Sequence, residues 1–266
     1  MKKFALIYIP LFLLLTSCEK ELDFHYHDVD RQLVIEGSLT RHGADVSLRN
    51  TTPMDEPMDR TPITDATVTI RDLTDGTCEH LYADAEGIFR NDTPGIVGHD
   101  YRLEVKRGEK NYASVCTMTS ATDITGLEFQ WIKMPYDYVA VLQVSFTDSP
   151  GTGDCYWVRL TRNGRAYRWT MVDDSHAEDG IINEVIMTTR KDIGEEDEKS
   201  LLLPGDVVGV TVTPISQDML DYLMALEADS NGPRMFDGDY CLGYFIAAPV
   251  ADSSIVFNPD DMTEYK

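Results

Sequence analysis

The first half of the chain alternates hydrophobic and polar residues in short runs that turn residues separate. Over residues 66–71 and again over 101–106 every second residue is apolar, which is typical of a strand with one buried face. Shorter runs of the same kind occupy residues 33–37, 46–48, 81–82 and 112–115. Asp75-Gly76 and Arg107-Gly108 stand between runs, as hairpin turns do. About seven strands without a helical run predict a β-sandwich over residues 32–121, of immunoglobulin-like or transthyretin-like type.

A second β-rich domain is predicted over residues 122–266. Two of its strands carry an apolar residue at every second position: Ala140, Leu142, Val144 and Phe146 in one, and Tyr156, Val158 and Leu160 in the next. Asn163-Gly164 then predicts a two-residue hairpin. One short helix is expected near residues 216–228, because Ser216 can cap it and apolar residues recur at helical spacing. We expect the apolar stripe of this helix to cover an open end of the second sheet.

The N-terminal residues have the composition of an export signal. Two lysines precede an apolar run over residues 4–15, which is shorter than the roughly 20 residues that a membrane-spanning helix needs. Residues 15–18, Leu-Thr-Ser-Cys, resemble the lipobox of bacterial lipoproteins. The resemblance implies that residues 1–17 are removed and that Cys18 becomes a lipidated N-terminus, an anchor strong enough to be permanent. A plain signal peptide with a chance cysteine is the alternative.

Residues 18–31 are predicted to form a lipidated tether. Its acid-rich start, residues 19–23, is similar to the tether that sends some Bacteroidetes lipoproteins to the cell surface. We therefore expect attachment to the cell outer membrane, with surface-exposed and periplasm-facing display both open. His25 and His27 would point the same way in an extended segment and form a candidate transition-metal pair. Solvated linker residues are the simpler interpretation, so no metal site is assigned.

Charge and motif content exclude several classes of function. The chain has 23 Lys and Arg against 46 Asp and Glu, a formal net charge of -23 at pH 7, which repels nucleic acid. The motifs GxSxG, HExxH, GxxxxGK[ST] and GxGxxG do not occur, so the enzyme classes that depend on them lack their starting residues. We expect a non-enzymatic protein without a cofactor.

Acidic runs leave two alternatives open. Residues 173–180 contain four acids and residues 195–198 are four acids in a row, and carboxylates are the ligands that calcium prefers. Neither run has the spacing of an EF-hand, so solvated loops are favoured over a calcium-dependent adhesin. A carbohydrate- or peptide-acting hydrolase would draw on carboxylates of the second domain. The candidates are Asp173, Asp174, Asp237 and Asp239.

Apart from the predicted lipidated Cys18, the mature chain has an even number of cysteines. They are Cys78, Cys116, Cys155 and Cys241. In an exported chain they permit two disulfides in three pairings, and the pairs Cys78–Cys116 and Cys155–Cys241 would each stay within one domain. Buried free thiols are the alternative, because nothing local fixes the distance between the sulfur atoms.

Two tryptophans form a candidate binding surface in the second domain. Trp157 has the parity opposite to that of Tyr156 and Val158, so its side chain should leave the core face of the strand. With Trp169 on the next predicted strand it would offer a stacking platform for a sugar ring or a peptide. Coverage by the helix or by the neighbouring domain is the alternative.

The order of several short motifs resembles a known family. The motifs occupy residues 33–37 (LVIEG), 65–70 (DATVTI), 98–105 (GHDYRLEV), 212–226 (VTPISQDMLDYLMAL) and 241–248 (CLGYFIAA). They look like the uncharacterised Bacteroidetes lipoproteins grouped as DUF4249, over nearly the whole mature chain. The resemblance implies an envelope lipoprotein, often accompanied by outer-membrane TonB-dependent receptors, and no catalytic residue. We therefore expect a binding or assembly accessory with such a receptor as its partner.

Overall fold

The computed structural model describes residues 30–53, 56–57, 61–135, 138–149, 153–190, 201–230 and 232–264. Their strands all belong to one unit, Arg31–Lys266. The predicted signal peptide (1–17), Cys18, the tether up to residue 29 and the acidic run 195–198 lie outside the described residues. Within the described ranges, no helix is long and apolar enough to cross a bilayer.

The first β-sandwich contains nine strands. Seven of them come from the N-terminal half: β1 (Leu33–Thr40), β2 (Gly43–Asn50), β3 (Thr67–Asp72), β4 (Cys78–Ala83), β5 (Ile88–Asn91), β6 (Asp100–Arg107) and β7 (Lys110–Thr117). With two C-terminal strands at the edges, the hydrogen-bonded order is β14-β7-β6-β3-β4-β5-β2-β1-β15. Both halves of this order contribute side chains to one apolar core. The mainly β fold that the alternation predicts is confirmed, and β5 is a strand that the pattern did not indicate.

Close packing between β1 and β6 shows how the two layers face one another. Every second residue of β1 is buried, including Ile35 and Gly37. A Cβ atom at Gly37 would lie only 2.9 Å from Leu103 Cδ2 of β6. Since β1 and β6 lie in opposite halves of the strand order, this contact crosses the core between two layers. Glycine at this position lets the layers approach.

The C-terminal part of the chain returns to the first sandwich, which corrects the predicted division into 32–121 and 122–266. β14 (Asp237–Gly238) pairs with β7, and β15 (Leu242–Ala247) lies parallel to β1. Phe245 of β15 is buried in the first core. A boundary drawn from sequence order misses this arrangement, because the alternation that marks a strand does not identify the strand it pairs with.

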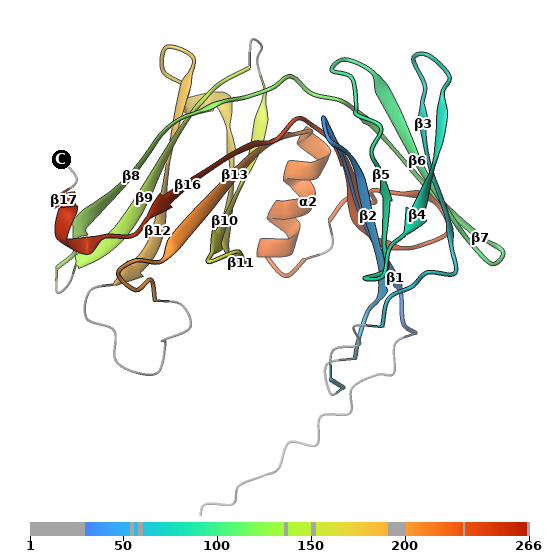
Figure 1. Cartoon of the computed structure of the whole chain (residues 1–266), viewed down its shortest axis with the longest axis horizontal. Coiled ribbons are helices and arrows are strands. Elements are labelled where there is room, and N and C mark those ends of the chain that lie inside the picture. The colour runs from blue at the N-terminus through green and yellow to red at the C-terminus, as the bar shows by residue number, and fades with distance from the viewer. Residues whose placement is uncertain are drawn as a thin grey trace, which may run out of the picture. The chain divides into compact units, whose positions relative to one another are not determined.

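Two four-stranded sheets form the second β-sandwich. Its strands are β8 (Ile124–Lys133), β9 (Tyr138–Thr147), β10 (Cys155–Arg162), β11 (Arg165–Asp173), β12 (Ile181–Arg190), β13 (Val207–Ile215), β16 (Ala251–Val256) and β17 (Thr263–Glu264). One sheet has the order β11-β10-β13-β16 and the other β12-β9-β8-β17 (Figure 1). The face predicted for β9 is fully buried, and the rings of Phe146 and Tyr156 meet between the sheets at 5.0 Å, edge to face.

The hairpin between β10 and β11 has the turn that Asn-Gly predicts. Asn163 has φ of 49° and Gly164 has φ of 77°, and Arg162 pairs with Arg165 across the turn. Positive φ at both central residues matches the twist of the flanking strands, which is why asparagine followed by glycine is favoured there.

The helix α2 (Gln217–Glu227) begins where the sequence places it. The Ser216 hydroxyl accepts a hydrogen bond from Met219 N at 3.2 Å and so caps the first turn. Met219 and Leu223 are buried as expected, whereas Leu226 is exposed. The buried side chains join a cluster on the outer face of β10, so the helix covers a sheet face and not the predicted open end.

Candidate functional site

The predicted surface tryptophans lie in contact on neighbouring strands. Trp157 of β10 faces away from the second core that holds Tyr156 and Val158, as its parity indicates. Side chains of α2, including Met219, cover it, so Trp157 is only 9% exposed and is not an open platform. Trp169 of β11 is 41% exposed, and the two indole rings meet edge to face at 6.4 Å. The accessible aromatic surface is therefore that of Trp169, supported by Trp157 beneath it.

Arg159 lies two residues beyond Trp157 on the same face of β10. Its guanidinium carbon is 4.5 Å from the centroid of the Trp157 ring, a cation–π contact. Its Nη2 donates to Thr213 Oγ1 at 3.2 Å. Arg159 Nε and Trp157 Nε1 are buried without a hydrogen-bond partner among the described residues. Each unsatisfied donor of this kind costs about 1–3 kcal/mol of stability.

A cleft of about 360 Å³ lies beside Arg159 and Thr213, with strands of both sandwiches in its walls. The first sandwich contributes a polar lining of Glu36, Ser38, Thr40, Asp45 and Ser47. Burial, followed by the charge of Glu36, raises the pKa of Tyr244 in the wall to about 12, so this phenol stays neutral at physiological pH. The hydroxyls and the Arg159 side chain in this lining suit a partner that carries carbonyl or hydroxyl oxygens.

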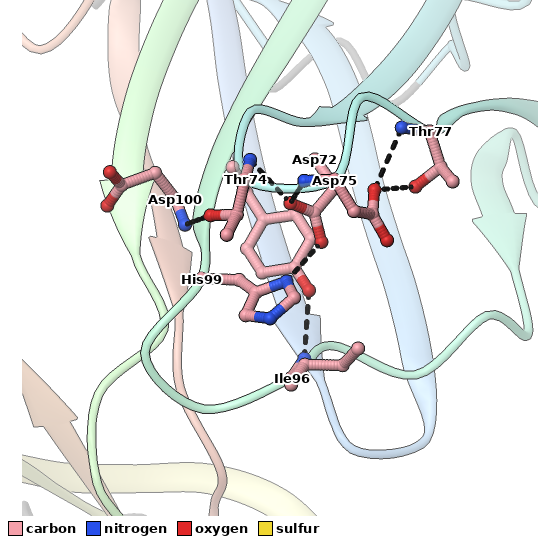
Figure 2. A network of polar contacts seen from close by, with 8 residues as sticks. Asp72, Thr74, Asp75, Thr77, Ile96, His99 and Asp100 are labelled. Carbon is pink, nitrogen blue, oxygen red and sulfur yellow. Dashed lines mark hydrogen bonds and ion pairs between the residues drawn. The ribbon is translucent and has the colours of Figure 1, made fainter.

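A second polar site lies at the end of β3, in the first sandwich. The Asp72 side chain is only 5% exposed. Its Oδ1 accepts hydrogen bonds from Thr74 N at 2.8 Å and Asp75 N at 3.2 Å, both in the following turn. Its Oδ2 lies 2.7 Å from Nδ1 of His99, in the segment that leads into β6 (Figure 2). Asp72 thus joins two loops that are far apart in the sequence.

The turn beside Asp72 holds a second carboxylate. Asp75 Oδ1 accepts hydrogen bonds from Thr77 N at 2.8 Å and Thr77 Oγ1 at 2.7 Å. Asp72, Asp75 and Thr77 line a cavity of about 210 Å³. Its apolar walls consist of Leu39, Ala44, Ile70, Leu81, Pro94, Ile96 and the ring of Tyr101. The cavity therefore has an apolar body and an acidic side.

The electrostatics of this site keep Asp72 ionised. Burial alone would raise its pKa, but the hydrogen bonds from His99, Thr74 N and Asp75 N outweigh burial and hold the pKa below the ordinary value. Asp72, Asp75 and His99 each offer one ligand atom, and these atoms all lie within 4.8 Å of one another. They are residues that could hold a metal ion.

Three carboxylates gather at a corner of the second sandwich. Asp148, Asp154 and Asp174 each offer one oxygen within 4.8 Å of the others. Asp154 Oδ2 is buried without a partner among the described residues, and burial, then the charges of Asp148 and Asp174, raise the pKa of Asp154. Only Asp174 of this group belongs to the predicted acidic run 173–180. Asp173 instead caps the 3-10 helix η2 (Asp174–His176).

The family model described as domain of unknown function DUF4249 matches residues 19–253. The chain belongs to this family. A comparison with curated proteins finds no match. Among solved structures, the chain is similar to a segment of two fibronectin type III domains from chicken tenascin, with 17% identity, 70% of this chain and 92% of that chain covered, and a TM-score of 0.23. It is also similar to a cytokine receptor complex, with 9% identity, 84% and 95% covered, and a TM-score of 0.26.

The described cysteines of this DUF4249 protein are all free thiols. Neither of the bridges Cys78–Cys116 and Cys155–Cys241 is formed. Cys78 lies on β4 and Cys116 on β7, with β3 and β6 between them in the strand order. Cys155 belongs to the cluster around α2, whereas Cys241 lies in the core of the first sandwich. Burial raises the pKa of Cys155 to about 11 and that of Cys241 to about 12. These two thiols therefore behave as small buried hydrophobic groups.

The carboxylates considered for a hydrolase do not form one site. Asp239 accepts a hydrogen bond from Asn111 N at 2.8 Å, and Asp237 lies in β14, so both belong to the first sandwich. Asp173 ends β11 and Asp174 follows it, so both belong to the second sandwich. The candidate metal pair His25 and His27 lies outside the described residues.

Sequence reasoning missed Asp72, His99 and Arg159. Asp72 and His99 are 27 residues apart, and Arg159 and Thr213 are 54 apart. No motif of neighbouring residues indicates contacts between residues so far apart in the sequence. The Asp-x-Thr-Asp sequence that begins at Asp72 is typical of a turn and indicated only a turn.

Proposed function

We propose that the protein is a lipoprotein of the cell outer membrane, anchored through Cys18, that works as a non-enzymatic binding or assembly accessory. Its partner is an envelope receptor of the TonB-dependent class. The lipobox-like residues 15–18 support the anchor, and the DUF4249 match begins at residue 19, directly after the cysteine. The match therefore leaves the predicted signal peptide outside the family domain.

The observation that supports a binding role is the cleft that the half-buried side chain of Arg159 lines together with Thr213. The Arg159 guanidinium is held in place by its cation–π contact with Trp157 and by the hydrogen bond from its Nη2 to the Thr213 hydroxyl. Backbone carbonyls of an extended receptor loop would accept hydrogen bonds from the part of the Arg159 guanidinium that lines the cleft. The exposed ring of Trp169 lies against Trp157 and offers additional apolar contact area. Arginine and tryptophan are the residue types that contribute most to interface energies.

Crosslinking in intact cells tests the cleft. Receptor peptides should be recovered with the wild-type protein, and Arg159→Ala and Trp169→Ala should each reduce their yield at least about tenfold. Arg165→Ala is the matched control, because Arg165 is an exposed arginine on β11. Equal yields from all variants, or no receptor peptide with the wild type, would refute the binding role.

Lipid labelling tests the anchor separately. Cys18→Ala should abolish incorporation of labelled fatty acid and release the protein from the membrane fraction, since the acyl chains supply the membrane affinity. Cys78→Ala serves as the control because Cys78 is an exposed thiol of the folded part. Label that persists in Cys18→Ala would show that the anchor is elsewhere.

A further inference from the structure

Three side chains with metal-binding atoms meet at the end of the first sandwich, from two separate segments. Asp72 closes β3, Asp75 lies in the turn that follows, and His99 precedes β6 (Figure 2). The set combines two carboxylates with one imidazole, and their ligand atoms all lie within 4.8 Å of one another. It is therefore a mixed nitrogen and oxygen donor set, not a collection of surface acids.

The turn holds both carboxylates in orientation. Thr74 N and Asp75 N bind Oδ1 of Asp72, so its Oδ2 is directed to His99. Both hydrogen bonds from Thr77 go to Oδ1 of Asp75, which leaves Oδ2 outside this pair of bonds. Figure 2 shows the two backbone N–H bonds on one oxygen of Asp72, the contact with His99 on its other oxygen, and both Thr77 bonds on one oxygen of Asp75. Hydrogen bonds of this kind are what orient carboxylate ligands around metal ions in proteins.

We propose that Asp72, Asp75 and His99 bind a divalent first-row transition metal ion, for which zinc is the probe of choice. Imidazole nitrogen and carboxylate oxygen are both ordinary zinc ligands. Two ligands about 2.1 Å from one zinc ion lie about 3.4 Å apart in tetrahedral geometry. Asp72 Oδ2 and His99 Nδ1, now 2.7 Å apart, need to separate by less than an ångström, and exposed Asp75 can approach by rotating its side chain.

The three residues leave a fourth coordination position for another ligand. Asp72 and Asp75 also line the 210 Å³ cavity, so a molecule in that cavity lies next to the ion. Sites with three protein ligands keep a position open for water or an incoming group. This metal site goes beyond the proposed receptor binding, because it involves neither the cleft at Arg159 nor the anchor at Cys18.

Calorimetric titration of the full chain in detergent with zinc chloride tests the site. We expect one zinc ion per chain, bound about 100-fold or more weaker in His99→Asn and at least about tenfold weaker in Asp75→Asn. Asparagine at position 99 keeps a donor for Asp72, and asparagine at 75 keeps an acceptor for Thr77. His80→Asn, which changes an exposed histidine on β4, should bind as the wild type does.

The pair His25 and His27 must be separated from this site, so the double variant His25→Asn/His27→Asn is titrated in parallel. Retained binding in the double variant and weakened binding in His99→Asn support the proposal. Binding lost in the double variant and kept in His99→Asn, or no zinc binding by the wild type, overturns it. Visible absorption of the cobalt-loaded chain gives a second readout, and its persistence in His99→Asn also overturns it. If His99→Asn does not fold, the Asp75→Asn titration replaces it: zinc binding at least about tenfold weaker than in the wild type supports the site, and unchanged binding overturns it.

Discussion

Two acidic corners of the second sandwich differ in the donors that the fold supplies. Asp206, in the loop before β13, accepts hydrogen bonds from Arg162 Nε at 2.6 Å, Asn163 Nδ2 at 2.7 Å and Leu203 N at 2.7 Å. Asp154, directly before β10, has one oxygen buried without a partner among the described residues. Both are loop aspartates beside a strand, so their difference arises from what packs against them.

The pKa values of these two carboxyl groups are shifted in opposite directions for this reason. Burial raises both, but in Asp206 the hydrogen bonds outweigh burial and the pKa is lowered. In Asp154 the charges of Asp148 and Asp174 add to the effect of burial, and the pKa is raised. A loop carboxylate therefore stabilises this fold only where N–H donors converge on it.

Removal of the Asp206 carboxylate, which has all its hydrogen-bond donors, should have the largest effect on stability. Asp206→Ala should lower the free energy of unfolding by about 3 kcal/mol, because it leaves the half-buried guanidinium of Arg162 and the amide of Asn163 without their acceptor. Urea unfolding followed by fluorescence measures the change. Exposed Asp92→Ala should stay within about 0.5 kcal/mol of the wild type. A loss below about 1 kcal/mol in Asp206→Ala would show that its hydrogen bonds do not set the stability of this corner.

The pH dependence of Asp206→Asn sharpens the comparison. A lowered pKa in the folded state means that ionised Asp206 stabilises the fold above its unfolded pKa, near 3.8, and that this stability is lost as the pH falls through the folded value. The variant should be about 2 kcal/mol less stable than the wild type at pH 7, and the gap should narrow below pH 3.8. Unfolding curves at pH 7 and below pH 3.8 measure this difference in stability. A difference that does not change with pH would contradict a lowered pKa of Asp206 in the folded state.

Local pattern explains how much of this fold could be predicted from the sequence. The buried face of β9 and the Asn163-Gly164 turn depend on neighbouring residues only, and both were predicted correctly. The pairing of β15 with β1 and the contact of Asp206 with Arg162 join distant parts of the chain. The same holds for the candidate sites, where parity gave the face of Trp157 but left open whether that face is accessible or covered by the helix.

Neutralising Asp154, the carboxylate without a partner, should stabilise the fold, in contrast to the changes at Asp206. Asp154→Asn should raise the free energy of unfolding at pH 7 by about 1 kcal/mol, because it removes a charge that is buried beside two others. A raised folded-state pKa destabilises the fold above that pKa and has no effect once the pH is below the unfolded value of 3.8. The advantage of the variant should therefore disappear in acid. Thermal unfolding at pH 7 and pH 3 checks this, with Asp92→Asn as the control.

The smallest predicted effect tests whether the repulsion in this corner acts on Asp154. Asp174→Asn should stabilise the fold by about 0.5 kcal/mol, because the amide oxygen can still accept the 2.7 Å hydrogen bond from Gly153 N while the charge is removed. In the Asp154→Asn background the same change should add nothing, since the charge that it relieves is already absent. An unchanged gain of 0.5 kcal/mol in the double variant would place the repulsion between Asp174 and another group, such as Asp148.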